Sequence, residues 1–218
     1  MTLSRRLACI ALVAWPRCSA PPPELDDLGP LPPFALTDET GHAVTDQSLH
    51  GTVWAANFLF TSCPTECPPL ARASSKLAQQ LGANASDNVA VISISVDPMT
   101  DTPEILTAFK RRYPPEESKI ERPAPKPWHL LTGDYPAMER LVVQGFMQPI
   151  LRADKVFGTP SDVTAVQQPT PLDTAHSLRF VVVDQRGHIR AMYGREMPEL
   201  ARMAHAMHWL AAHPPEDL

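Results

Sequence analysis

The sequence predicts one α/β domain in which helices cover a central β-sheet. Two observations support this prediction. Apolar runs of strand length alternate with stretches of helical periodicity between residues 52 and 146, and the chain closes with a strand, a turn, a second strand and a helix. The 218 residues are 44% hydrophobic and 20% charged, which is enough for one sizeable core in an ordinary globular protein.

The first twenty residues are typical of an export segment. Arg5 and Arg6 precede an apolar run, Leu7 to Trp15, that is too short to span a bilayer, and small residues that suit a cleavage site follow it. We therefore expect residues 1–20 to be a signal or anchor segment, the protein to be exported to the periplasm, and its N-terminus to lie at or near the membrane. A proline-rich linker, residues 21–33, is expected before the domain.

The first half of the domain predicts a hairpin followed by a βαβ unit. Residues 34–51 alternate apolar and polar positions around a turn at residues 39–41, which is typical of a β-hairpin. Residues 52–60 form an apolar strand and residues 68–81 a helix, and a β-branched strand follows over residues 88–97. The two strands of such a unit lie parallel, with the helix covering one face of the sheet.

The second half of the domain continues the alternation. In order, it predicts a helix over 102–113, a short strand and turn over 127–133, a helix over 136–146, an irregular insertion over 148–174, a β-hairpin over 177–193 and a helix over 197–212. This order matches a thioredoxin-like three-layer sandwich with an added N-terminal β-hairpin, occupying residues 34–213. In such a fold the loop after the first central strand carries the chemistry, because it leaves the carboxyl end of that strand.

That loop contains two cysteines. Cys9 and Cys18 belong to the leader, so an exported mature chain keeps only Cys63 and Cys67. In an oxidising compartment a close pair becomes a disulfide unless it is reduced or occupied by a metal. The prolines around the pair exclude regular helix from the loop, so the helix begins near Cys67. The helix dipole is then expected to lower the pKa of the Cys67 thiol.

The spacing of the two cysteines favours a metal. A disulfide needs sulfurs about 2.05 Å apart, whereas two thiolates on one metal stand roughly 4 Å apart. Three intervening residues suit the wider separation, although a disulfide, and hence redox activity, stays open. His176 is the candidate third ligand, because it precedes the strand of the second hairpin, which the fold brings near the cysteine loop.

Several motifs occur in a fixed order along the chain. They are "FTSCPTECP", "SVDP" followed by "DTP", "WHLLTG", and "HS" ahead of "FVVVD" and a glycine. With these motifs the chain resembles the Sco/SenC family of copper chaperones, thioredoxin-like proteins that help to assemble the dinuclear copper centre of cytochrome c oxidase. The resemblance extends from about Phe34 to Ala212.

The resemblance implies that Cys63, Cys67 and His176 are copper ligands. Two thiolates suit Cu(I), and an added imidazole allows Cu(II) as well. Asp97, in "SVDP", is implied as a group that supports the ligands, with a turn or helix-capping aspartate as the alternative. The implied partners are the copper-site subunit of cytochrome c oxidase, which receives copper by ligand exchange, and a thiol reductant that keeps the cysteines reduced.

Three other functions are alternatives to copper delivery. A thiol-disulfide oxidoreductase acting on the cysteines of a copper-site protein would need Cys63 and Cys67 but not His176. A peroxiredoxin is disfavoured, because Phe60 occupies the position where that class places a peroxide-binding threonine. Nucleic acid is not expected as a partner, because the net charge is −5 and the basic residues are scattered.

Overall fold

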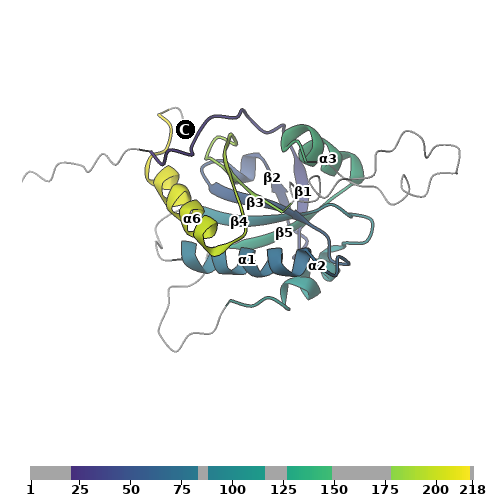
Figure 1. The fold of residues 1–218 in the computed structure, drawn as a ribbon. Helices are drawn as coiled ribbons and strands as arrows, with labels where there is room; N and C mark the ends of the chain where they lie inside the picture. The colour runs from purple at the N-terminus through teal and green to yellow at the C-terminus, as the bar shows by residue number, and fades with distance from the viewer. Residues whose placement is uncertain (1–20, 83–87, 116–126, 149–177, 217–218) are drawn as a thin grey trace, which may run out of the picture.

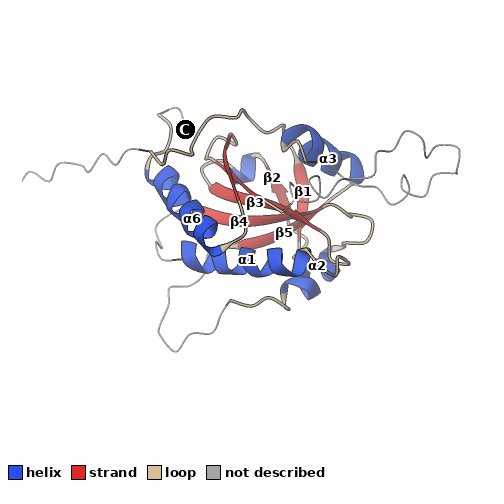
Figure 2. Ribbon diagram, in the orientation of Figure 1, coloured by secondary structure: helices blue, strands red, loops and turns tan. Residues whose placement is uncertain are grey.

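The computed structural model describes residues 21–82, 88–115, 127–148 and 178–216. They form a sheet of seven strands, ordered β2-β1-β5-β4-β3-β6-β7, with helices on both faces (Figures 1 and 2). The strands are β1 (Ala35–Asp38), β2 (Ala43–Thr45), β3 (Val53–Leu59), β4 (Val89–Ser95), β5 (Trp128–Thr132), β6 (Phe180–Val183) and β7 (Ile189–Tyr193). The helices are η1 (Gln47–Leu49), α1 (Cys67–Leu81), α2 (Pro103–Lys110), α3 (Tyr135–Glu139), η2 (Arg140–Gly145) and α6 (Met197–Ala212).

The predicted βαβ unit is confirmed. Strands β3 and β4 pair in parallel, in register from Val53 with Val89 to Leu59 with Ser95. Every residue of both strands is buried, as expected for central strands that are covered on both faces. Strand β3 therefore lies deep inside the sheet, and its carboxyl end delivers the cysteine loop.

Two hairpins complete the sheet. Strands β1 and β2 form the predicted N-terminal hairpin, and β1 adds to the sheet by pairing antiparallel with β5. Strands β6 and β7 form the predicted second hairpin, and β6 pairs antiparallel with β3. Gly41 in the first hairpin turn has a φ of 88°, a conformation that strains residues with a side chain.

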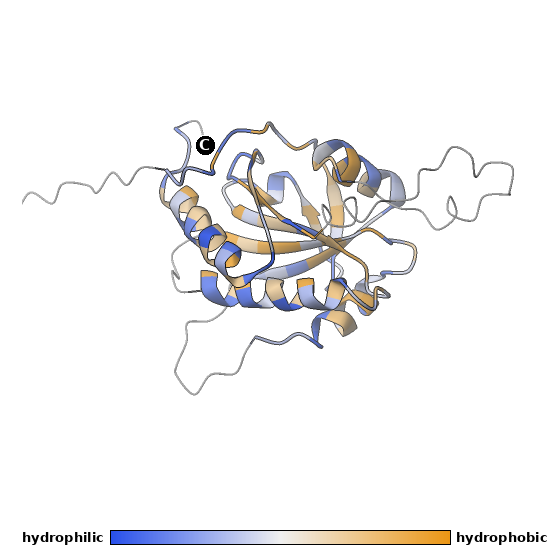
Figure 3. Cartoon of the chain, in the orientation of Figure 1, coloured by the Kyte–Doolittle hydropathy of each residue, from blue (hydrophilic) through white to orange (hydrophobic). Residues whose placement is uncertain are grey.

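The three-layer arrangement follows from two separate cores. One core packs α1, α2 and α6 on one face of the sheet, and the other packs α3 and η2 on the opposite face. The second core is aromatic, since Phe146 makes edge contacts with Trp54 and Phe58 at ring-centroid distances of 5.9 and 5.1 Å. Figure 3 shows strands that are mostly apolar and helices that carry both apolar and polar residues. The predicted thioredoxin-like sandwich is confirmed.

Two segments differ in detail from the expectations. The predicted helix over 136–146 divides into α3 and a π-helical turn, η2, where Gly145 approaches Pro32 so closely that a β-carbon would lie 2.8 Å from the proline ring. Within the segment expected to be a linker, residues 26–31 hydrogen-bond to the backbone along and just before β7. The N-terminal segment thus packs on the domain.

Several expectations fall outside the described residues. They concern the export segment, residues 1–20, most of the irregular insertion, and His176, which follows that insertion. Among the helices that the structure describes, none is both long enough and apolar enough to cross a membrane.

Candidate metal centre

The cysteine loop, residues 60–66, joins β3 to α1 at the centre of the sheet. Strand β3 lies between β4 and β6, and α1 begins at Cys67 with Pro68 in its first turn. Proline is tolerated there because the first N–H groups of a helix have no partner within the helix. The prediction that the helix begins near Cys67 is confirmed. The free N–H groups of this helix face back toward the loop.

The two thiols occupy different environments. Cys63 is partly exposed, whereas Cys67 is 4% exposed and belongs to the core beneath α1. Both are free thiols. The Cys63 sulfur accepts a hydrogen bond from the Cys67 N–H at 3.4 Å, and the Cys67 sulfur accepts one from the Phe60 N–H at 3.5 Å. Cys63 thus faces outward above a buried partner.

These environments move the two pKa values in opposite directions. Burial raises the pKa of Cys63, but hydrogen bonds from the Cys67 thiol and from the N–H groups of Cys67, Thr65 and Glu66 outweigh it, so the pKa is lowered. Burial raises the pKa of Cys67 to about 12, and the charges of Cys63 and Asp101 add to the effect.

The expectation that the helix dipole lowers the pKa of Cys67 is therefore wrong. The free N–H groups at the start of α1 point at the sulfur of Cys63, four residues earlier, while the Cys67 side chain turns into the core. At Cys67, loss of hydration outweighs the favourable position at the helix terminus. The helix stabilises a thiolate, but on Cys63.

A buried carboxylate anchors the loop to the neighbouring strand. Asp101 is fully buried and accepts hydrogen bonds from the Thr61 N–H at 3.1 Å, from the Thr61 hydroxyl, and from the Ser95 hydroxyl at 2.6 Å. Thr61 lies at the start of the loop and Ser95 at the end of β4. Because Asp101 holds these segments together, it fixes the position of the loop relative to the sheet.

Asp97, the aspartate expected from the sequence, lies in the same turn with different contacts. Its N–H donates to the Ser95 hydroxyl at 3.1 Å, and its carbonyl accepts from the N–H groups of Thr100 and Asp101. These contacts shape the turn after β4. Asp101 was missed in the sequence, although it stands in the "DTP" motif that was noted there. A role for Asp97 beside the ligands stays a prediction.

An arginine holds the other end of the loop. Arg195, which follows β7, donates to the Glu66 carboxylate at 2.7 Å and to the Glu66 carbonyl at 3.4 Å. The Glu66 N–H is one of the donors to the Cys63 sulfur. This contact joins residues that are 129 positions apart in the chain, and no local pattern in the sequence pointed to it.

Of the predicted ligands, the structure brings Cys63 and Cys67 together at the head of α1. His176 lies outside the described residues. An exposed thiol of lowered pKa above a buried thiol can bind a soft metal ion, and it can also take part in dithiol chemistry.

Comparison with known proteins identifies relatives along most of the chain. A model of the SCO1/SenC family matches residues 26–212. The SCO1 protein homolog of Bacillus subtilis (strain 168) is 43% identical over 82 residues, which are 38% of this chain and 42% of that protein. Mitochondrial protein SCO2 of Saccharomyces cerevisiae is 25% identical over 186 residues, or 85% of this chain and 54% of that protein. The chain therefore spans about half the length of these curated relatives, or less.

Solved structures agree with the family match. A SCO1/SenC family lipoprotein from Bacillus anthracis str. Ames superposes with a TM-score of 0.61 at 25% identity, over 85% of this chain and 97% of that one. BsSco, a member of the Sco family of cytochrome c oxidase assembly proteins in which a disulfide switch was identified, gives 0.62 at 26% identity, over 87% and 98%. Copper-bound ScoI of Bradyrhizobium japonicum shares the fold, with 0.60 at 22% identity over 84% and 99%. Because the family model covers the domain from the N-terminal segment to the end of α6, this chain belongs to the SCO1/SenC family.

Proposed function

We propose that this chain is a copper metallochaperone of cytochrome c oxidase assembly, with Cys63, Cys67 and His176 as its copper ligands. The observation that carries the proposal is the thiol pair at the head of α1, in which a partly exposed Cys63 of lowered pKa lies above a buried Cys67. Membership of the SCO1/SenC family supports it, as do relatives described with copper bound.

The chemistry of the thiols suits a cargo that must be both held and released. Thiolates are soft ligands that favour Cu(I), and an imidazole extends the site to Cu(II). Cys63 supplies a thiolate near neutral pH more readily than Cys67, which gives up its proton when the metal binds. Uptake therefore releases protons and weakens as the pH falls. Because this chain binds copper through few ligands, one of them an exposed sulfur, the ligands of a copper-site subunit can replace its own ligands one at a time.

The setting of the site belongs to the same proposal. We infer that residues 1–20 export the protein to the periplasm and leave its N-terminus at or near the membrane. Because an oxidising compartment converts a close cysteine pair to a disulfide, a thiol reductant is needed before copper can bind. We also propose that Asp97 supports the ligands, so that Asp97→Asn weakens copper binding by roughly 10- to 100-fold.

Anaerobic copper titration of the reduced full-length chain tests the ligand set. The wild type should form an equimolar complex. Cys63→Ser and His176→Ala should each weaken binding by more than roughly 100-fold, because losing a ligand exceeds the usual cost of disturbing a supporting group. His205→Ala is the matched control, since His205 is exposed on α6, and it should bind as the wild type does. Copper binding that survives both Cys63→Ser and His176→Ala would reject the ligand set.

A second function is favoured by the same thiols. A partly exposed cysteine of lowered pKa beside a buried cysteine is an arrangement in which one thiolate attacks a disulfide and the other resolves it. The protein would then act as a thiol-disulfide oxidoreductase on the cysteines of a copper-site protein. His176→Ala separates the two functions, because it should abolish copper binding and leave disulfide reduction intact.

A further inference from the structure

A second group of metal-binding side chains lies where β1 ends beside β5. Strand β1 stops at Asp38, which leaves the Leu130 N–H of β5 without a strand partner, and the Glu39 carboxylate accepts it at 2.9 Å. The side chains of Asp38 and Glu39 are 7% and 5% exposed. Carboxylates are seldom buried to this extent unless they are paired or coordinate a metal.

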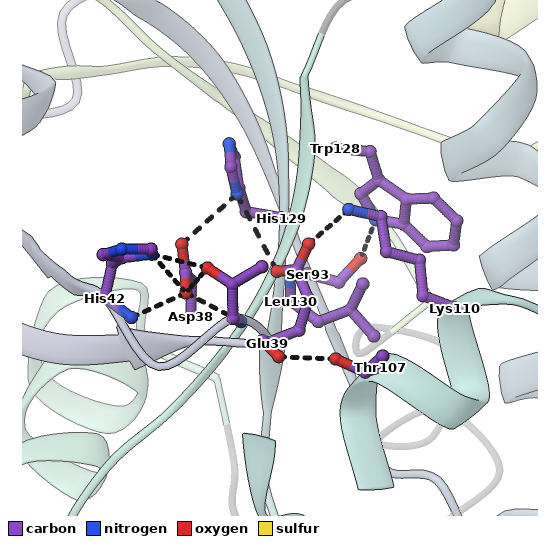
Figure 4. A network of polar contacts seen from close by, with 10 residues as sticks. Asp38, Glu39, His42, Ser93, Thr107, Lys110, Trp128, His129 and Leu130 are labelled. Atoms are coloured by element: carbon purple, nitrogen blue, oxygen red, sulfur yellow. Dashed lines mark hydrogen bonds and ion pairs between the residues drawn. The ribbon is translucent and has the colours of Figure 1, made fainter. Parts of the chain in front are cut away.

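Hydrogen bonds fix the direction of both carboxylates (Figure 4). Asp38 Oδ1 accepts from the Thr40 N–H at 2.8 Å, from the Thr40 hydroxyl at 2.7 Å and from the His42 N–H at 2.9 Å, so Asp38 Oδ2 is left to face His129. Glu39 Oε1 pairs with the Lys110 ammonium, and Glu39 Oε2, which accepts the hydrogen bond from the Leu130 N–H, faces the same ring. Supporting contacts of this kind are typical of ligands held ready for a metal.

The third member of the group, His129, points a ring nitrogen into the space between the carboxylates. Its Nδ1 atom is buried and has no hydrogen-bond partner among the described residues. It lies 3.7 Å from Asp38 Oδ2 and 3.8 Å from Glu39 Oε2, distances too long for hydrogen bonds. A buried nitrogen without a partner needs an explanation, and an ion is one of the usual ones.

We propose that Asp38 Oδ2, Glu39 Oε2 and His129 Nδ1 form a binding site for a divalent transition-metal ion such as Zn²⁺. The three atoms lie within 4.8 Å of one another. Donors on one tetrahedral Zn²⁺, at about 2.1 Å each, stand roughly 3.4 Å apart, so small side-chain rotations close the site and water supplies the fourth ligand. One nitrogen and two oxygens suit Zn²⁺ better than Cu(I), which prefers thiolates.

The charges of the group favour a cation. Burial raises the pKa of Glu39, but the Lys110 ammonium and the Leu130 N–H oppose it, and the pKa is held at about 2. The pKa of Asp38 is also lowered, although burial raises it, because of hydrogen bonds from Thr40 and His42. Two buried anions therefore face one lysine, and the excess negative charge favours the binding of a cation. The ammonium occupies the other oxygen of Glu39, so it does not block the site.

Occupancy of this site would join three elements of the fold. Asp38 ends β1 and Glu39 follows it, His129 lies in β5, and the Glu39 carbonyl accepts from the Thr107 hydroxyl of α2. A ligand that binds the folded state alone stabilises it by mass action. The site is independent of the proposed copper centre, since it shares no residue with it.

Zinc binding by a chain that lacks the copper ligands tests the proposal. In a Cys63→Ser, Cys67→Ser, His176→Ala background, Zn²⁺ alone is titrated by calorimetry. Adding His129→Ala should lower the Zn²⁺ affinity by at least roughly 10-fold, as should adding Asp38→Asn. Adding His205→Ala, at an exposed position of α6, should leave the Zn²⁺ affinity unchanged. Unchanged zinc affinity in the His129→Ala variant would overturn the site.

Nitrogen NMR of the same background provides a readout that needs no further substitution. Zn²⁺ should shift the Nδ1 resonance of His129 and leave the Nε2 resonance nearly in place, and it should raise the midpoint of thermal unfolding. If His129 instead carries a proton and pairs with both carboxylates as an imidazolium, both ring nitrogens stay protonated in the presence of Zn²⁺. That result would also overturn the proposal.

Discussion

Replacing Asp101 by asparagine should weaken the fold at the cysteine loop. The substitution removes one charge and keeps the size of the side chain. The wild-type carboxylate is fully buried and accepts three hydrogen bonds, two from Thr61 and one from Ser95. Asparagine can keep its oxygen toward Thr61, but its amide group then faces the Ser95 hydroxyl, which must turn around to accept.

The size of the loss follows from those three bonds. A hydrogen bond to a charged group contributes about 1.5–3 kcal/mol and one between neutral groups about 1 kcal/mol. Each bond should therefore lose about 0.5–2 kcal/mol, so Asp101→Asn should lower the free energy of unfolding by about 1.5–6 kcal/mol. For a domain of this size, each kcal/mol lost corresponds to a fall of roughly 2–4 °C in the midpoint of thermal unfolding.

The same substitution should change the alkaline behaviour of Cys67. Burial is the main cause that raises the pKa of Cys67 to about 12, and the charge of Asp101 contributes. Since an unfolded cysteine loses its proton near pH 8.5, well below the pKa of about 12 in the folded protein, the free energy of unfolding should fall as the pH rises from about 8.5 toward 12. Asp101→Asn lowers the pKa of Cys67, so this alkaline loss should become smaller.

Two measurements on anaerobically reduced protein check these effects. Denaturant unfolding at several pH values gives the free energy of unfolding, and alkylation followed by mass spectrometry gives the pH profile of each thiol. Glu104→Gln, three residues away and exposed on α2, is the matched comparison and should leave the Cys67 profile as it is. An Asp101→Asn protein within about 0.5 kcal/mol of wild type, with an unchanged Cys67 profile, would refute the reasoning.

Three further predictions concern the surroundings of the loop. At mildly alkaline pH, iodoacetamide should alkylate Cys63 faster than Cys67, because the pKa of Cys63 is lowered, whereas the pKa of Cys67 is raised and its thiol is buried. Equal rates would contradict the conclusion that Cys63 is the more acidic thiol. Arg195→Ala should lower the free energy of unfolding by less than about 1 kcal/mol, since the ion pair of Arg195 with Glu66 is partly exposed. The substitution should nevertheless shift the pH profile of Cys63 alkylation, and Arg195→Lys should shift that profile less. Leu70→Ala, at a fully buried position in α1, should lower the free energy of unfolding by about 2–5 kcal/mol in denaturant titrations, and a loss below 1 kcal/mol would argue against tight packing there.

Much of the fold was predictable because its patterns are local. The continuous apolar runs of β3 and β4 indicated central strands, and the prolines around Cys67 marked the start of α1. The first hairpin followed from alternating positions around a turn, and the second from an apolar strand, a turn and a partner strand. The close packing of Gly145, at the end of the π-helical turn, against Pro32 was not predictable, because the two residues are more than a hundred positions apart.

The supporting groups of the candidate site were harder to find. Asp101 looks like any aspartate before a helix, and its importance comes from a contact with Thr61, 40 residues away. The cluster of Asp38, Glu39 and His129 is assembled from two strands that are distant in sequence. No spacing rule joins such residues, because the pairing of β1 with β5 brings them together.

By itself, the sequence determined the class of fold, the order of its elements and the pair of thiols at the head of a helix. Only the tertiary structure decided which thiol is the more acidic. A helix terminus is a local feature that favours thiolate, but the cost of removing charge from water depends on everything packed around the sulfur. That packing buries Cys67 and leaves Cys63 partly in solvent, which reverses the order expected from position alone.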